Sequence, residues 1–370
     1  KKKKLLFALL LLCMSCSNND PIQFALAADS NKIQRVMQNL DAYEVQIMVT
    51  DADGNDFEFQ VNDKNYFYPA SSVKFPVALL ALEKANNKLS NFDSSTIFQV
   101  EGDSVQTNIR KEITKIFAVS DNDAYNRLFE LMGQFEINTK LGYGKKLAPI
   151  RISHRVGTTD ASAIFTKPVA FFNDDRIFYE RIAMKNNPIE SLKLNRIQKG
   201  KGFYRNDSLI SEPMDFSKKN YLPIATLHKI MKRLHNPNEY GPRERFDLDK
   251  SDREFLLKAM SKTPKQQGFT DPEYYDSYVK FFMFGDSKEP IPDHIKIFNK
   301  VGYAYGYLTD CAHIIDTKNQ ISFTITATIH VNKNQIFNDD TYEYDEIGIP
   351  FLAELGRQVH QFYLNKKQQN

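Results

Sequence analysis

Apolar and polar positions near the start of the chain predict a helix, a β-hairpin and a second, buried helix. Residues 31–40 place apolar side chains at helical spacing. Residues 43–49 have the pattern of a strand, and residues 57–61 alternate apolar and polar positions. An Asp-Gly turn signal between them predicts that the two strands form a hairpin. Residues 73–82 are rich in Val, Ala and Leu, which predicts a helix that is apolar on most sides and therefore buried.

The other end of the chain has a similar arrangement. Residues 305–315 and 321–331 predict two further strands, and residues 350–364 predict a closing amphipathic helix. Strands at both ends of the chain around a long middle predict an α/β (α+β) fold. We expect one antiparallel sheet that is built from both chain ends and flanked by helices.

The middle of the chain is expected to be helical. We expect one domain over residues 29–368, with an α/β part made of residues 29–95 and 285–368 and an all-helical subdomain of residues 96–284 between them. The chain has 370 residues, of which 42% are apolar, and this supplies enough material for a large core. The formal net charge of +3 falls to −1 when the four lysines at the start are set aside. This near-neutral balance gives no reason to expect nucleic acid as a partner.

The first residues have the pattern of an export signal. Four lysines precede the apolar run of residues 5–12, which is too short to cross a bilayer. Ser15 directly before Cys16 resembles a bacterial lipobox, which implies a signal peptide of residues 1–15 and lipidation of Cys16. Residues 16–28 would then be a polar tether, and the protein would be a membrane-anchored lipoprotein facing the periplasm or the cell surface. An ordinary secretory signal that is cut a few residues later is the alternative.

The cysteines and histidines argue against a disulfide framework and against a metal site. Three cysteines cannot make such a framework, and Cys311, in a predicted strand, is expected to be a buried structural thiol. The seven histidines are scattered without the spacing of metal ligands. We therefore expect no catalytic metal.

The strongest chemical signal is an S-x-x-K motif, with Ser71 and Lys74 at its ends. Ser71 opens the predicted helix, so its backbone N–H lies at the positive end of the helix dipole. Lys74 lies one turn further on the same face, from where its amine can reach the Ser71 hydroxyl. Burial, or a neighbouring cation such as Lys300, would lower the pKa of Lys74 and make it a base. The alternative is a helix start with an exposed lysine, but the apolar surroundings would make an unpaired lysine costly.

A second motif, S-D-N, begins at Ser120 and ends at Asn122. It lies between an apolar helix end and a new helix. The Ser120 hydroxyl could pass a proton to a leaving amine, and the Asn122 amide could hold Lys74 and bind a substrate carbonyl. Asp121 is expected to brace the turn. The alternative is an ordinary helix N-cap, for which these residue types are well suited.

A third motif, K-x-G, begins at Lys300 and ends at Gly302. Lys300 would attract a substrate carboxylate, and Gly302 would let substrate approach the backbone closely. The N–H of Tyr303, together with that of Ser71, could form an oxyanion hole. The start of a strand with an exposed lysine is the alternative.

The three motifs in this order, and the sequence around each of them, resemble the class A β-lactamase-like serine hydrolases of the serine β-lactamase and penicillin-binding protein superfamily. The resemblance covers residues 31–365. It implies an α/β sandwich beside a helical subdomain, with Ser71 between them. It also implies acylation of Ser71 by a β-lactam or a related amide or ester, followed by hydrolysis, with no cofactor.

Two positions depart from the family pattern. Val301 replaces a threonine whose hydroxyl helps to hold the β-lactam carboxylate, a change worth about 1.5–3 kcal/mol. The family's E-x-x-L-N motif, whose glutamate activates the deacylating water, has no clean counterpart. Glu190, followed by Leu194 and Asn195, is one residue too long, and Glu212 lacks the Leu-Asn pair. These two glutamates are the candidate deacylation bases.

Two other functions remain open beside the hydrolase. A peptidase or acyl-transferase similar to penicillin-binding proteins would act on cell-wall peptide and deacylate slowly. A non-catalytic envelope lipoprotein would keep the pocket only for binding. In each case we expect a monomer whose partner is a small β-lactam or a cell-wall peptide.

Overall fold

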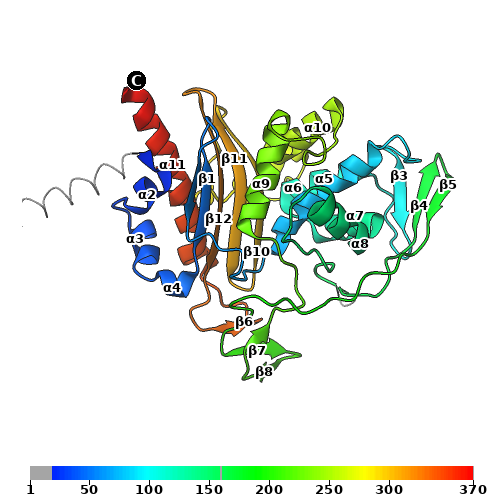
Figure 1. Cartoon of the computed structure of the whole chain (residues 1–370), viewed down its shortest axis with the longest axis horizontal. Coiled ribbons are helices and arrows are strands. Elements are labelled where there is room, and N and C mark those ends of the chain that lie inside the picture. The colour runs from blue at the N-terminus through cyan, green and yellow to red at the C-terminus, as the bar shows by residue number, and fades with distance from the viewer. Residues whose placement is uncertain (1–18, 159–160, 370) are drawn as a thin grey trace, which may run out of the picture.

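The computed structural model describes residues 19–158 and 161–369, as helices and strands in the order that Figure 1 shows. The described helices are α2 (Pro21–Leu26), α3 (Asn31–Met37), α4 (Leu40–Tyr43), α5 (Lys74–Ala85), α6 (Ile109–Val119), α7 (Asn122–Met132), α8 (Gln134–Asn138), α9 (Ile224–His235), α10 (Lys250–Ser261) and α11 (Ile349–Gln369). Single turns are η2 (Ala70–Val73), η3 (Thr139–Gly144), η4 (Pro237–Glu239), η5 (Lys265–Gln267) and η6 (Tyr344–Gly348). The described strands are β1 (Gln46–Thr50), β2 (Asp56–Phe59), β3 (Ile97–Val100), β4 (Val169–Asn173), β5 (Arg176–Arg181), β6 (Gln198–Lys199), β7 (Gly202–Arg205), β8 (Ser208–Ile210), β9 (Met214–Asp215), β10 (Ile295–Ala304), β11 (Tyr307–Asp316), β12 (Ile321–His330) and β13 (Ile336–Phe337).

Both ends of the chain contribute to the main sheet, as the sequence predicts. In the described residues this sheet has five strands in the order β10-β11-β12-β1-β2, and each neighbouring pair is antiparallel. Helices α2, α3 and α11 cover one face, and α9 and α10 pack on the other (Figure 1). Because both faces are covered, β1 is buried along its whole length, and most residues of β11 and β12 are buried as well. The predicted α/β fold with a sheet from both ends is confirmed.

The segment expected to be a tether is in part folded. Asp20 caps α2 by accepting a hydrogen bond from the backbone N–H of Ile22 at 2.8 Å. Ile22 is fully buried, and the Phe24 ring meets Phe362 of α11 at 5.6 Å between centroids. The tether prediction is therefore wrong from Pro21 onward, because the apolar residues of α2 find a core to enter.

The predicted signal peptide and Cys16 lie outside the described residues. Within residues 19–158 and 161–369, the helices are all too short or too polar to cross a membrane. Cys311 is described and fully buried, as expected, and burial holds the pKa of its thiol far above the ordinary value.

A second apolar core surrounds α5, which packs against α6 and α7. The part of the chain expected to be all-helical also contains strands. Strand β4 pairs with β3 and β5 to form a small sheet, and short strands β6 to β9 follow. Phe171 of β4 is buried against this core and stacks on Phe92 at 4.3 Å between ring centroids, so the strand packs on the helical core.

Candidate active site

Ser71 lies in the turn η2, directly before α5. The turn is tight: Ala70 has a positive φ of 46°, and the Ser72 hydroxyl donates to the Pro69 carbonyl at 2.6 Å. Ser72 is thereby buried, whereas Ser71 lines a cavity. Among the described residues, none forms a hydrogen bond with the Ser71 hydroxyl, which is therefore available to a substrate.

Lys74 is fully buried one turn after Ser71. Its amine donates to the Asn122 Oδ1 at 2.7 Å and to the Ser120 carbonyl at 2.5 Å. Burial lowers the pKa of Lys74 to about 7, although the negative charges of Asp121 and Asp123 act in the opposite direction and raise it. At neutral pH a large share of Lys74 is therefore an uncharged amine, which can accept a proton. The prediction that Asn122 holds Lys74 is confirmed by this contact.

Ser120 connects the two buried lysines. It ends α6 in the left-handed region with φ 57°, which turns its hydroxyl toward the sheet. The Ser120 Oγ accepts a hydrogen bond from Lys300 Nζ at 2.8 Å and faces Lys74 Nζ at 3.5 Å. Asp121 caps α7 by accepting from the Ala124 N–H at 2.7 Å. The bracing role expected for Asp121 is confirmed, and the cap leaves Ser120 and Asn122 to the lysines.

Lys300 is placed differently from the sequence expectation. It is buried behind Ser120, and its second hydrogen bond goes to the Val301 carbonyl at 2.7 Å. It is not among the described residues that line the cavity of Ser71. Burial first, and the charge of Lys74 second, hold the pKa of Lys300 well below its usual range. Burial is the largest cause that lowers the pKa of Lys74, and repulsion between the two buried ammonium groups disfavours the charged form of both lysines.

Gly302 is where strand β10 contacts the serine turn. A Cβ on Gly302 would lie 2.5 Å from the Pro69 oxygen, 2.7 Å from the Ser72 nitrogen and 2.9 Å from the Ser71 nitrogen. The close neighbour of this glycine within the protein is therefore the turn that carries Ser71. Tyr303 follows and lines the same cavity.

The cavity at Ser71 has a volume of about 340 Å³ and contains no carboxylate among the described residues. Glu190 and Glu212 are exposed elsewhere, so the structure brings neither candidate base to Ser71. The opposite wall contains His154, whose Nδ1 contacts the Arg155 carbonyl at 2.6 Å and whose Nε2 accepts from the Asn220 N–H at 3.3 Å. Burial lowers the pKa of His154 to about 4, so it is a neutral structural group.

The wall segment of residues 153–157 was not predicted from the sequence. Asn126 of α7 holds it through two hydrogen bonds with Val156, at 2.8 and 3.0 Å. Gly157 has a φ of 63°, and a Cβ there would lie 3.2 Å from the Asn122 amide nitrogen. The only local signal was this glycine, and its importance depends on packing against α7.

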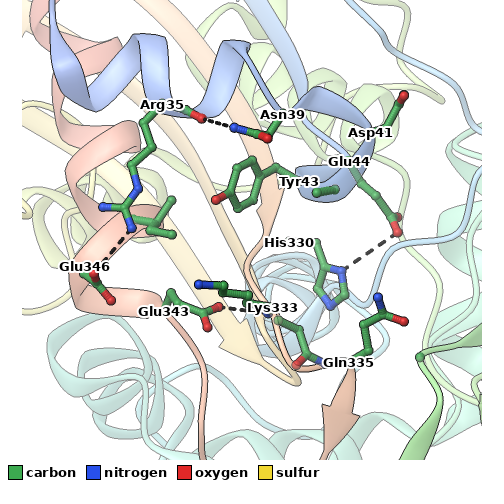
Figure 2. Close-up of a pocket in the computed structure, with 14 residues that line it drawn as sticks. Arg35, Asn39, Asp41, Tyr43, Glu44, His330, Lys333, Gln335, Glu343 and Glu346 are labelled. Atoms are coloured by element: carbon green, nitrogen blue, oxygen red, sulfur yellow. Dashed lines mark hydrogen bonds and ion pairs between the residues drawn. The ribbon is translucent and has the colours of Figure 1, made fainter.

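A larger cavity of about 670 Å³ lies between α3 and α4 and the end of β12 (Figure 2). Arg35 points to Glu346 across it at 3.3 Å, and His330 lies 3.9 Å from Glu44. None of the three motifs reaches this cavity. The serine chemistry therefore belongs to the smaller one.

A family model described as "Beta-lactamase enzyme family" matches residues 29–363. The chain belongs to the β-lactamase enzyme family. A comparison with curated proteins finds no match.

Solved structures of other family members have the same fold. A class A β-lactamase from Bacteroides cellulosilyticus has a TM-score of 0.54 at 12% identity, covering 94% of this chain and 99% of that one. A β-lactamase from Xanthomonas campestris has a TM-score of 0.54 at 12% identity, covering 93% and 99%. A β-lactamase from Chitinophaga pinensis has a TM-score of 0.51 at 13% identity, covering 90% and 99%. At such identities the likeness establishes the fold alone.

As a member of the β-lactamase family, this chain has a distinctive third motif. Val301 is 1% exposed and packs in the core beneath the sheet. Its methyl groups need no hydrogen bond when they are buried, whereas a buried threonine hydroxyl at the same place would need a hydrogen-bond partner. Burial thus explains the valine without any reference to substrate.

Proposed function

We propose that the protein is a serine acyl-transfer enzyme that forms a covalent acyl-enzyme at Ser71 with β-lactams or related amides and esters. The observation that carries the proposal is the buried Lys74 amine, with a pKa of about 7, one helical turn from the available hydroxyl of Ser71. A serine needs such a base to become a nucleophile at neutral pH.

The acylation step follows from these positions. Neutral Lys74 accepts the Ser71 proton, directly or through the Ser120 hydroxyl, while the Ser71 Oγ bonds to the substrate carbonyl carbon. The carbonyl oxygen becomes an oxyanion, which the N–H groups of Ser71 and Tyr303 stabilise. The bond from the carbonyl carbon to the leaving nitrogen then breaks, and that nitrogen takes the proton from Lys74 through Ser120, which Lys300 orients at 2.8 Å.

Release of the acyl group is slow in this proposal. Hydrolysis needs a base that takes a proton from water, and the described lining of the cavity contains no Asp or Glu. His154 has both ring nitrogens engaged. We therefore favour a long-lived acyl-enzyme, as in a penicillin-binding-protein-like peptidase or acyl-transferase.

Efficient β-lactam hydrolysis is the second candidate. It is favoured by the family and by Lys74, because an amine of pKa about 7 can activate water as well as serine. The two candidates differ only in how fast the ester at Ser71 is hydrolysed.

One experiment separates the two candidates. The protein is mixed with a chromogenic cephalosporin, and intact mass is followed with absorbance over time. We expect a stable adduct that is absent in Ser71→Ala and present in Ser72→Ala, with little turnover after one equivalent. Steady turnover without accumulated adduct would instead establish the hydrolase. The absence of both turnover and adduct would refute acylation and favour a binding protein.

We also propose, from the N-terminal sequence, that the protein is exported and anchored by a lipid on Cys16. Radiolabelled fatty acid should enter the protein in bacterial cells and fail to enter Cys16→Ser. Equal labelling of both forms would contradict the anchor.

A further inference from the structure

Strand β10 and the turn after it run past Ser71, with chemically different groups before and after the point of contact. At one end, Lys300 contacts the Ser120 hydroxyl at 2.8 Å. In the middle, Gly302 touches the serine turn. At the other end, Tyr305 follows the strand and lines the cavity. A strand rises about 3.3 Å per residue. Lys300 and Ala304, where β10 ends, therefore lie about 13 Å apart along the strand on either side of Gly302, and Tyr305 begins the turn beyond Ala304.

The proposed function assigns a part of the substrate to each end, and the inference here rests on that function. Ser120 passes the proton to the leaving nitrogen, so the leaving group lies at the Lys300 end. The carbonyl carbon is held at Ser71. The side chain of the acyl group must therefore extend the other way, toward Tyr305.

The acyl end contains aromatic rings and one cation that forms no ion pair with a described carboxylate. The Tyr68 and Tyr305 rings meet edge to face at 5.0 Å, and both line the cavity. The Lys219 amine lies 5.7 Å from the centre of the Tyr305 ring. In the described residues, no ion pair or hydrogen bond engages this amine. Its backbone is fixed, because Arg151 donates to the Lys219 carbonyl at 2.6 Å.

Among the residues that the structure describes, none forms an ion pair with Lys219. No Asp or Glu lines this cavity in the part of the chain that the structure describes. Its other described lining cation, Arg155, is buried and contacts Glu130. A half-buried ammonium that faces a cavity of this kind attracts an anion more strongly than an exposed one, because less water screens it.

We propose that this end of the cavity selects acyl groups that carry a carboxylate, and that Lys219 binds that carboxylate. The aromatic rings contact the apolar part of the acyl group, and Lys219 contacts its charge. The favoured substrates are thus acyl donors with an acidic side chain on the acyl side of the reacting carbonyl.

A matched pair of β-lactams tests this selectivity. Benzylpenicillin and α-carboxybenzylpenicillin differ only in one carboxylate on the acyl side chain. The second-order rate constant of Ser71 acylation is measured for each by intact mass, and their ratio is compared between variants, so that intrinsic reactivity cancels. We expect Lys219→Met to lower the preference for the carboxylated compound by about tenfold, and Lys219→Arg to retain it.

Controls separate charge from folding. Lys218→Met removes an exposed neighbouring lysine that does not line the cavity, and should leave the ratio unchanged. In the unaltered protein, raising the salt concentration from 0.05 to about 0.5 M should lower the same preference, without any substitution.

The outcomes are distinct. Adducts with both compounds, and a ratio that changes less than about twofold in Lys219→Met and in high salt, would overturn the role of Lys219 while leaving acylation at Ser71 intact. No adduct with either compound would overturn the proposed function, and the selectivity with it.

Discussion

The rate of Ser71 acylation should rise with pH through about 7. Only the uncharged form of Lys74 can accept the serine proton, and burial lowers the pKa of this amine to about 7. For one titrating group of that pKa, about one-eleventh is uncharged at pH 6 and about ten-elevenths at pH 8. The rate should therefore increase about tenfold between these values and level off above pH 8.

The electrostatic control of the Lys74 pKa can be tested further with Asp123→Asn. The exposed carboxylate of Asp123 stabilises the charged form of Lys74 and so raises its pKa. Its removal should move the midpoint to lower pH and make acylation faster at pH 6. Asp175→Asn, an exposed site on the turn between β4 and β5, is the matched control and should leave the midpoint unchanged.

The assay follows accumulation of the acyl-enzyme with excess chromogenic cephalosporin between pH 5.5 and 8.5, quenched at successive times and read by intact mass. A rate that is flat across this range, or that falls as pH rises, would refute Lys74 as the base. A midpoint that is identical in Asp123→Asn and the unaltered protein would refute the electrostatic account while leaving the base in place.

Three more outcomes follow from the geometry. Gly302→Ala places a methyl group within 2.9 Å of three backbone atoms of the serine turn, so we expect a loss of about 1–3 kcal/mol in urea unfolding together with slower acylation; normal values for both would contradict the close contact. Ser120→Ala removes the hydroxyl between the two lysines and should slow acylation at least about 100-fold, whereas an unchanged rate would exclude the proton path. The pKa of Lys74 is about 7 in the folded state and 10.5 ordinarily, so between these pH values Lys74 is protonated mainly in the unfolded chain. The free energy of unfolding should therefore rise with pH across that window. The slope is at most about 1.4 kcal/mol per pH unit, and Lys74→Met should abolish that component; equal slopes for both proteins would disprove the shift.

Local patterns were sufficient for much of this protein. The alternation in residues 57–61 and the apolar run at 73–82 reflect which sides of a strand or helix are buried, and that property repeats along the sequence. The S-x-x-K spacing likewise places Ser71 and Lys74 one turn apart, because the helical repeat fixes that distance. The family and the fold class could therefore be predicted from the sequence.

Contacts between distant segments could not be predicted in this way. The role of Gly302 depends on a turn more than 200 positions earlier in the chain. A glycine in a predicted strand indicates only that some other group approaches the backbone closely there, and does not say which group. The lowered pKa of Lys74 depends on how completely the folded chain excludes water, and so does the burial of Lys300 behind Ser120. Sequence names the ionisable groups, but their desolvation arises only in three dimensions.

The three motifs thus determined which serine and lysine belong together, because their spacing is local. The tertiary structure decided what surrounds them: a wall held by Asn126, a half-buried Lys219 over the Tyr305 ring, and no described carboxylate in the cavity. Neither Glu190 nor Glu212 reaches Ser71, although both were plausible from their neighbours in the sequence. A side chain acts where the folded backbone carries it, and in a long loop no periodic pattern fixes that place.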